Sequence, residues 1–310
     1  MTAEAPATHA ALALAGRTLR YAEVEREGSG PGHLRRLGAC EFDFDVDHAV
    51  LGGAGPTYLE TVSTAVCEVF ARTTARVLTV VAPPSALVGF STPLPDGLPA
   101  VQRYEQLRQE AALLADVSPT QPARIRAAPV RVERLPSGPH VWHHVLHVPE
   151  MVHARLVLLG RSLGMGAYDL VEATRAAAAV IRTAVAGTEV GEEGPPQYEL
   201  VVGLWGGRAE FALCRQGAWY AGHHGPAHTS EDATYFALAM LERMRVSPVH
   251  LRRLFVYGDE AAPARFSLLA DFLGLQAELL DPLALFGRRP PNATPAALSA
   301  YAPCIGALLA

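Results

Sequence analysis

Two glycine turns hold the residues of this sequence whose types and spacing could do chemistry. Residues 16–18 (Gly-Arg-Thr) follow an apolar run over residues 9–15, and residues 206–208 (Gly-Gly-Arg) follow a second apolar run over residues 200–204. Each turn opens a hairpin, so neighbouring backbone N–H groups can point at one anion while Arg17 or Arg208 neutralises its charge. Such an arrangement is typical of a phosphate site.

Phosphate chemistry usually also needs a carboxylate to hold a metal ion. The second apolar run has Val, Gly, Leu and Trp at residues 202–205, where an acid would be expected, and the first has Leu-Ala at residues 14–15. Without these acids Mg²⁺ has no obvious protein ligand, and an attacking water has no obvious base. We therefore expect no hydrolysis.

Composition excludes several other classes of protein. All 26 basic residues are arginine, so there is no GxxxxGK[ST] loop and no lysine base or Schiff base. The net charge of −5 argues against nucleic acid as the main partner. The 4 cysteines form no CxxC pair. The first residues make a poor signal peptide and no apolar run reaches membrane-spanning length, so we expect a soluble cytoplasmic protein without membrane insertion.

The elements expected around the two turns occur twice in the same order, without an obvious sequence repeat. The first turn leads to strands over residues 19–25 and 34–44, a helix over residues 56–73 and a buried strand over residues 76–81. The second leads to a hairpin, a helix over residues 230–245, a buried strand over residues 254–257, a helix over residues 264–273 and a strand over residues 277–280. Thr229 and Asp232 fit a capping box at the start of the first of these helices.

The polar residues 188–196, rich in Gly and Pro, are the expected link between two α/β halves. We predict a first domain over residues 1–187 and a second over residues 197–310 that ends in a short helix. The first domain contains extra material at about residues 83–139, including a helix over residues 100–115, which we predict to be an inserted subdomain.

These segments resemble the actin-like ATPase fold, and within it PilM-type pilus assembly proteins. ALALAGRTLRYAEVE (residues 11–25) resembles their first phosphate hairpin, and residues 76–119 resemble the strand, loop and helix that lead into the inserted subdomain. LFVYGDEAAPARFSLLADFLGLQAELLDPL (residues 254–283) resembles the adenosine-side segment, and residues 301–310 the terminal helix. Residues 229–248 also resemble an uncharacterised bacterial family of actin-like proteins with degenerate nucleotide sites. The resemblance implies a duplicated, ribonuclease H-like α/β fold.

The resemblance also implies a nucleotide cleft, from which this sequence departs. The family has Asp in each hairpin, whereas the corresponding stretches here are Leu-Ala-Gly at residues 14–16 and Gly-Leu-Trp-Gly at residues 203–206. The adenosine-side glycine pair becomes Gly-Asp at residues 258–259. If nucleotide binding is retained, the residues expected to contact the nucleotide are Gly16, Arg17, Thr18, Gly206, Gly207, Arg208, Gly258, Asp259 and Glu260.

A plainer interpretation of the same residues is open. The two turns can be ordinary hairpin turns whose arginines are solvated, since short glycine motifs occur often by chance. Asp259 and Glu260 can cap the helix that follows them rather than contact a ribose.

The motif GRSLG, residues 160–164, is a competing signal, because it matches the G-x-S-x-G nucleophile elbow with Ser162 as the nucleophile. The order Ser, acid, His is available through Asp232 and His250. The helical interpretation places Ser162 near the end of a helix that begins at residues 149–150 and stops at Gly164. Its apolar stripe consists of Val152, Leu156, Leu159 and Leu163.

Histidines gather in two places: His140, His143, His144 and His147, and then His223, His224 and His228. On a strand His143 and His147 share one face while His144 points away. A zinc site needs three or four convergent ligands, and neither an HExxH motif nor a cysteine spacing supports one, so we expect no metal site.

The favoured hypothesis is a non-catalytic scaffold or adaptor with a degenerate nucleotide cleft, no catalytic residue and no cofactor. By resemblance, its protein partner is a cytoplasmic peptide of an inner-membrane assembly component, docked on the first domain or its insert, and homo-oligomers are compatible with it. Two alternatives stay open. One is an ATP-binding switch of the actin-like class that binds ATP and Mg²⁺ with little hydrolysis, and the other is a serine hydrolase that uses Ser162.

Overall fold

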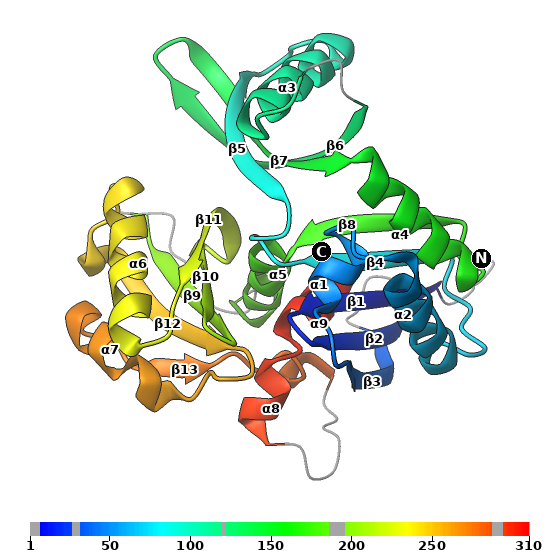
Figure 1. Cartoon of the computed structure of the whole chain (residues 1–310). Coiled ribbons are helices and arrows are strands. Elements are labelled where there is room, and N and C mark those ends of the chain that lie inside the picture. Colours follow the sequence, from blue (N-terminus) through cyan, green and yellow to red (C-terminus); the bar gives the residue numbers. More distant parts are fainter. Residues whose placement is uncertain (1–6, 27–31, 119–121, 186–195, 287–293, 310) are drawn as a thin grey trace, which may run out of the picture.

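The computed structural model describes residues 7–26, 32–118, 122–185, 196–286 and 294–309. Its strands form two five-stranded sheets and one three-stranded sheet in this part of the chain. Figure 1 shows the two halves side by side, with the three-stranded sheet above them. The predicted α/β fold with two similar halves and an inserted subdomain is thereby confirmed.

The first sheet has the strand order β3-β2-β1-β4-β8 and the second has the order β11-β10-β9-β12-β13. In both, an antiparallel three-stranded unit comes first, and its first strand then pairs in parallel with a buried strand. The strands of the first sheet are β1 (Ala7–Ala15), β2 (Thr18–Arg26), β3 (His33–Glu41), β4 (Val77–Ala82) and β8 (Ala167–Glu172). Those of the second are β9 (Tyr198–Trp205), β10 (Arg208–Arg215), β11 (Ala218–Pro226), β12 (Leu251–Tyr257) and β13 (Ala277–Leu279).

Helices cover both faces of each five-stranded sheet, so the central strands are mainly apolar and every residue of β9 is buried, Glu199 included. The longer helices are α2 (Pro56–Val69), α3 (Ala100–Leu114), α4 (Glu150–Ser162), α5 (Ala173–Val185) and α6 (Ser230–Arg243). The shorter ones are α1 (Val46–Val50), α7 (Ser267–Leu273), α8 (Pro295–Ser299) and α9 (Ala302–Leu309), with 3₁₀ turns η1 (Pro248–His250), η2 (Pro263–Phe266) and η3 (Ala284–Phe286). The predicted capping box of Thr229 and Asp232 is confirmed at the start of α6.

The helices α5 and α9 lie between the two sheets and pack closely on each other. The run of alanines at residues 176–179 faces this contact, and a Cβ atom on Gly306 would collide with the carbonyl oxygen of Ala176. The core that contains α9 also contains residues of β1, β2 and β4. The terminal helix, assigned from the sequence to the second domain, therefore completes the core of the first half.

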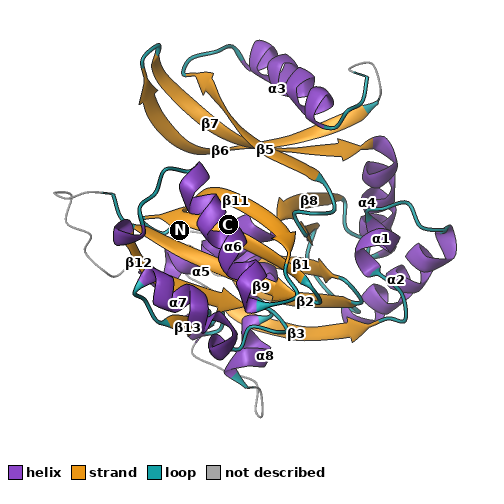
Figure 2. Ribbon diagram, turned by 60° about the vertical axis from the view of Figure 1, so that its left-hand side comes forward, coloured by secondary structure: helices purple, strands orange, loops and turns teal. Residues whose placement is uncertain are grey.

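The inserted subdomain is a sheet of order β5-β7-β6, built from β5 (Val88–Pro95), β6 (Ala123–Leu135) and β7 (Gly138–Pro149). Helix α3 covers the face that points away from the two halves (Figure 2), over a core of Leu94, Leu107, Ala111 and Val145. The sheet continues to Pro149 rather than ending near residue 139, because β7 runs directly into α4.

A short helix, α1, lies between β3 and α2, where the sequence pattern predicts no helix. Strand β3 ends at Glu41 rather than at residue 44, and Asp45 then caps α1 by accepting a hydrogen bond from the backbone N–H of His48 at 2.9 Å. This helix places Asp47 beside the first glycine turn.

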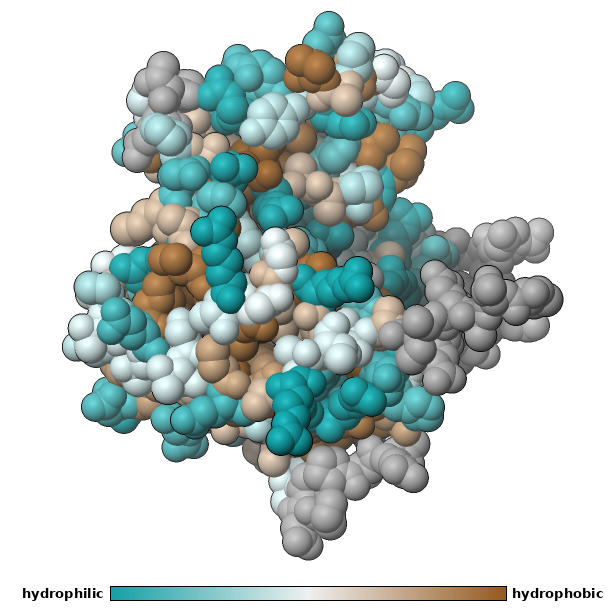
Figure 3. Space-filling view, turned by 90° about the vertical axis from the view of Figure 1, so that its right-hand side faces the viewer, coloured by the Kyte–Doolittle hydropathy of each residue, from teal (hydrophilic) through white to brown (hydrophobic). Residues whose placement is uncertain are grey.

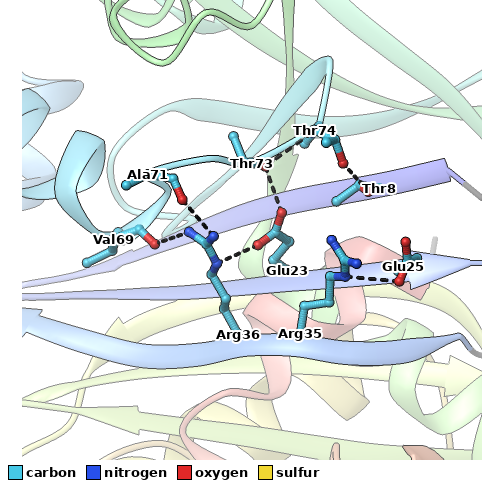
Figure 4. A network of polar contacts seen from close by, with 10 residues as sticks. Thr8, Glu23, Glu25, Arg35, Arg36, Val69, Ala71, Thr73 and Thr74 are labelled. Carbon is cyan, nitrogen blue, oxygen red and sulfur yellow. Dashed lines mark hydrogen bonds and ion pairs between the residues drawn. The ribbon is translucent and has the colours of Figure 1, made fainter.

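Buried charges hold the hairpin of the first half against α2 (Figure 4). Glu23 lies almost fully buried on β2 and receives hydrogen bonds from Arg36 at 2.8 Å and from Thr73 at 2.7 Å. The same guanidinium donates to the carbonyl oxygens of Val69 and Ala71 at the end of α2. A buried carboxylate is tolerated here because its oxygens are paired.

The face that carries α2 and α4 exposes several large hydrophobic side chains, Tyr58, Met151 and Leu158. Figure 3 shows this face as a mixture of hydrophilic and hydrophobic groups on both the inserted part and the body. Among the described residues no helix has the length and hydropathy that crossing a membrane requires.

Candidate functional site

The two glycine turns face each other across a cleft between the halves, and a carboxylate lies between them. The Asp47 Oδ2 atom accepts a hydrogen bond from the backbone N–H of Gly16 at 3.2 Å and lies 3.5 Å from the Arg208 guanidinium. Arg208 also donates to the hydroxyl of Ser85 at 3.1 Å. An anion of the chain itself thus occupies the place that the sequence suggests for a phosphate.

Burial raises the pKa of Asp47 to about 6, against the opposing effects of Arg208 and of the Gly16 N–H group. A carboxylate that is removed from water pays a desolvation cost, and here a single arginine and one backbone donor offset only part of it. The charge of Asp47 is therefore retained at neutral pH at some cost to the folded state.

A second ion pair, between Arg20 and Asp259, also joins the two halves across the cleft. Arg20, on β2 of the first half, is buried and donates a hydrogen bond to Asp259, which follows β12 in the second half. Its guanidinium also lies over the ring of Trp205, with 5.1 Å between Cζ and the ring centroid, and 5.9 Å from the ring centroid of Tyr301. Aromatic rings attract a cation that is shielded from water, so Arg20 joins the halves through both kinds of contact.

A buried carboxylate completes this arrangement on the side of the second half. Glu210 accepts hydrogen bonds from the Trp205 indole N–H and from the Tyr257 hydroxyl, both at 2.7 Å. Burial raises the pKa of Glu210, despite these two hydrogen bonds. A side chain at Gly203 would collide with Tyr257 and Glu210, which explains a glycine in the middle of β9.

The cleft between these side chains is nearly filled. The remaining space is about 10 Å³, and Arg20, Trp205, Arg208 and Glu210 contribute to its lining. Pockets for small molecules typically measure roughly 300–1,000 Å³, whereas roughly 10–15 Å³ holds a single water molecule. This cavity has no room for a nucleotide.

The other residues predicted to contact a nucleotide either bond to groups of the protein itself or shape turns. Arg17 donates to the carbonyl oxygen of Phe42 at 2.9 Å, next to the start of β2 at Thr18, and Glu260 pairs with Arg265. The hypothesis that Asp259 and Glu260 cap the next helix is wrong, because the cap residues of η2 and α7 are Ala262 and Phe266. Gly206, Gly207 and Gly258 have positive φ angles and shape the turns.

Sequence reasoning missed Arg20, Asp47, Glu210 and Tyr257. Arg20 and Glu210 occupy strands that carry other polar residues, so only the three-dimensional packing distinguishes them. The weak signal for Asp47 was the segment DFDVDH at residues 43–48, in which Asp45 can cap a helix.

The serine motif lies in a helix rather than at an elbow. Ser162 is the last residue of α4, and its hydroxyl donates to the carbonyl oxygen of Leu159 at 2.8 Å. A nucleophile elbow joins a strand to a helix. The structure therefore confirms the helical interpretation of this motif.

One of the two histidine clusters contributes to a buried junction of the two halves and the insert. His144 on β7 lies 3.4 Å from Glu172 at the end of β8, and Thr174 on α5 donates to the same carboxylate. Trp219 on β11 donates to Thr174 at 3.3 Å. The described residues include no group of three or more His, Cys, Asp or Glu side chains placed to hold a metal ion.

The repeated sheets, the paired hairpins and the inserted subdomain define the actin-like ATPase fold, which confirms the resemblance noted from the sequence. No protein-family model matches the sequence, and the curated proteins give no match. Among solved structures, the chain is similar to one from a PilM-PilN type IV pilus biogenesis complex, with a TM-score of 0.71 and 18% identity over 97% of both chains.

Two further structures are similar at greater distance. A protein of unknown function with an actin-like ATPase fold, from Bacteroides thetaiotaomicron, gives a TM-score of 0.51 at 10% identity over 91% of this chain and 96% of that one. The cytoplasmic domain of EpsL, an inner-membrane component of the type II secretion system of Vibrio cholerae, gives a TM-score of 0.46 at 10% identity over 81% of this chain and 82% of that one. Identities this low establish a shared fold alone.

Proposed function

We propose that this chain is a non-catalytic scaffold of the actin-like fold, whose nucleotide cleft is closed by its own side chains. The observation that carries the proposal is the cleft itself. Asp47 occupies the phosphate position of the first turn, Arg20 and Trp205 fill the interior, and about 10 Å³ remains. The two hairpin acids expected for metal binding are absent from the corresponding positions of the sequence.

The partner that we propose is a cytoplasmic peptide of an inner-membrane assembly component, and the chain would act on the cytoplasmic side of the membrane. The likeness to a chain of the PilM-PilN complex supports a role in assembly with another protein. The exposed hydrophobic residues around α2 and α4 supply apolar surface on the first half.

An ATP-binding switch is the second candidate, and one observation favours it. Arg20 Nη1 and Arg208 Nε are buried guanidinium nitrogens that have no hydrogen-bond partner among the described residues, and both residues line the remaining cavity. Guanidinium groups are the usual ligands of phosphates. If the two halves moved apart, these atoms could contact a nucleotide.

Isothermal calorimetry with ATP, with and without Mg²⁺, tests the proposal. We expect no binding heat at millimolar ATP. The Asp47→Gly variant is the informative control, because it removes the internal anion from the first turn and leaves Arg208 in place. Tight binding that requires Mg²⁺ in the unaltered chain would contradict the proposal and support the switch.

A serine-directed phosphonate probe, with Ser162→Ala as its control, tests the hydrolase alternative, and we expect no labelling of Ser162.

A further inference from the structure

A large groove lies between the inserted subdomain and the second half. This groove measures about 1340 Å³. One wall consists of β5 and the end of α3, the other of α6, and β11 lies along the floor (Figure 1). The volume exceeds the roughly 1,000 Å³ of a large small-molecule pocket, so it suits a segment of polypeptide.

The residues of the groove have the composition of a protein interface. Trp, Tyr, Phe, Met and Arg are enriched at the centres of such interfaces, and Lys, Glu and Asp are depleted. The groove contains two acidic residues, Glu110 and Glu172, and the second is paired with His144. Its aromatic, methionine and arginine residues include Trp142, Trp219, Tyr235, Phe236, Met240 and Arg243.

The walls expose apolar side chains that nothing in the described chain covers. Leu113 and Leu114 on α3 are 74% and 57% exposed, and Tyr235 on α6 is 67% exposed. They line the groove from opposite sides. Side chains of this kind gain free energy when a partner removes them from water.

The floor of the groove supplies backbone groups for hydrogen bonding. Strand β11 is at the edge of its sheet. The carbonyl oxygen of Tyr220 points outward from that edge, because it accepts a hydrogen bond from Arg131 of β6 at 2.6 Å. The register with β10 shifts at Tyr220, so the direction of the groups beyond it follows from the hairpin pairing instead. Trp205 and Arg208 flank a two-residue turn and form a hydrogen-bonded pair, so the backbone groups of Glu210 and Ala212 point toward β9 and those of their β11 partners, His224 and Gly222, point outward. An edge of this kind pairs readily with an added strand.

Two buried polar atoms at the groove also lack partners. The indole N–H of Trp142 and the Nδ1 atom of His144 make no hydrogen bond with the described residues, and His144 is 4% exposed. A buried donor without an acceptor is unfavourable. An extended peptide has free backbone carbonyl groups that can accept from such donors, whereas the backbone carbonyls of an α-helix are engaged within the helix.

We propose that this groove binds an extended, largely apolar peptide segment of a protein partner, which adds as a strand to the free edge of β11. Its apolar side chains contact Leu114, Tyr235 and the neighbouring aromatic residues, and a backbone carbonyl accepts from Trp142. This inference rests on the proposed scaffold function and moves the partner site to a groove that the second half helps to form.

The test begins with a random-peptide display selection against the full chain, followed by fluorescence polarisation with the selected peptides. Leu114→Glu and Leu158→Glu form a matched pair, because both side chains are 57% exposed and Leu158 lies on α4, outside the groove. We expect Leu114→Glu and Tyr235→Glu each to weaken binding at least about tenfold, which corresponds to about 1.4 kcal/mol. Leu158→Glu should leave the affinity within about twofold.

Backbone N-methylation of the selected peptide tests strand addition. Methylation at alternate residues on one edge of the peptide should abolish binding, and methylation on the other edge should have little effect. If Leu158→Glu abolishes binding while Leu114→Glu does not, the peptide binds the first half, which overturns this inference and leaves the scaffold function intact. Recovery of no binding peptide, or equal effects of methylation on both edges, also contradicts it. Calorimetry with ATP tests the closed cleft independently of these outcomes.

Discussion

The cleft between the halves and the groove beneath the insert differ in how their polar groups are used. In the cleft, Arg20 pairs with Asp259 and Asp47 with Arg208, so charges of one half approach charges of the other. About 10 Å³ remains there, against about 1340 Å³ in the groove, whose apolar walls stand exposed. Under the proposed function, the cleft belongs to the interior of the protein, and the groove is the surface that binds a partner.

A cluster of polar contacts lies at the floor of the groove. His144, Glu172, Thr174 and Trp219 tie the insert, the first half and the second half together at one point. Burial raises the pKa of Glu172, but the His144 ring, 3.4 Å away, and a hydrogen bond from Thr174 outweigh this and hold the pKa below its usual value. A buried carboxylate with these partners therefore joins the insert to both halves.

The largest expected effect concerns the tryptophans of the two regions. Trp205 is 7% exposed in the cleft, so Trp205→Ala should lower the free energy of unfolding by about 4 kcal/mol through the cavity that it leaves. Trp142 lies at the groove and stacks on Arg131, so Trp142→Ala should lower the free energy of unfolding by only about 1 kcal/mol. Urea unfolding of both variants makes the comparison. Equal losses would mean that the groove wall is as tightly packed as the cleft.

The next effect depends on pH. The pKa of Asp47 is raised from 3.8 to about 6 in the folded state. The folded state therefore binds its proton more tightly than the unfolded state, and the chain loses stability as pH rises through this window. The Asp47→Asn variant cannot ionise at this position. Its free energy of unfolding, measured relative to that of the unaltered chain, should therefore increase by up to about 3 kcal/mol between pH 4 and pH 7. Urea titrations at both pH values measure it, and a constant difference between the two proteins would contradict the assignment.

A smaller loss is expected from the ion pair across the cleft. Asp259→Ala leaves the buried guanidinium of Arg20 without its carboxylate, while Asp259 itself is 44% exposed at its side chain. We expect the free energy of unfolding to fall by about 2 kcal/mol, less than the roughly 3–5 kcal/mol lost when one partner of a fully buried ion pair is removed. In an Arg20→Met background the same substitution should have almost no effect. A loss that persists in that background would show that Asp259 acts through other contacts.

The smallest effect concerns the groove wall. Tyr235→Ser and Arg243→Ala alter exposed residues of α6 that line the groove, so each should change the free energy of unfolding by less than about 0.5 kcal/mol. Thermal denaturation by circular dichroism is sufficient to measure this. A loss of more than about 1 kcal/mol from either variant would mean that the wall supports the fold rather than a partner.

The order of elements could be predicted because its signals are local. Apolar runs, glycine breaks and the capping box at Thr229 each depend on a few neighbouring residues, and they located β1, β9, α6 and the insert. Helix α1 has five residues beside a glycine-rich stretch, so its pattern was too short to recognise. The contact between Arg20 and Asp259 joins residues that are 239 positions apart, and no local pattern encodes it. Hence the sequence indicated a cleft without its acids but could not reveal which side chains fill it.

The position of α9 has a consequence for how the protein folds during synthesis. Cys304 lies 3.4 Å from the carbonyl oxygen of Ala11, although 293 positions separate them along the chain. The core around β1 and β2 therefore cannot close while the first half emerges from the ribosome, because the helix that covers β1 is made only after the second half. Contacts of such long sequence separation form slowly. A nascent chain would keep this face of β1 exposed until α9 has been made, and removal of α9 would leave the core around β1 and β2 incomplete although both strands are present.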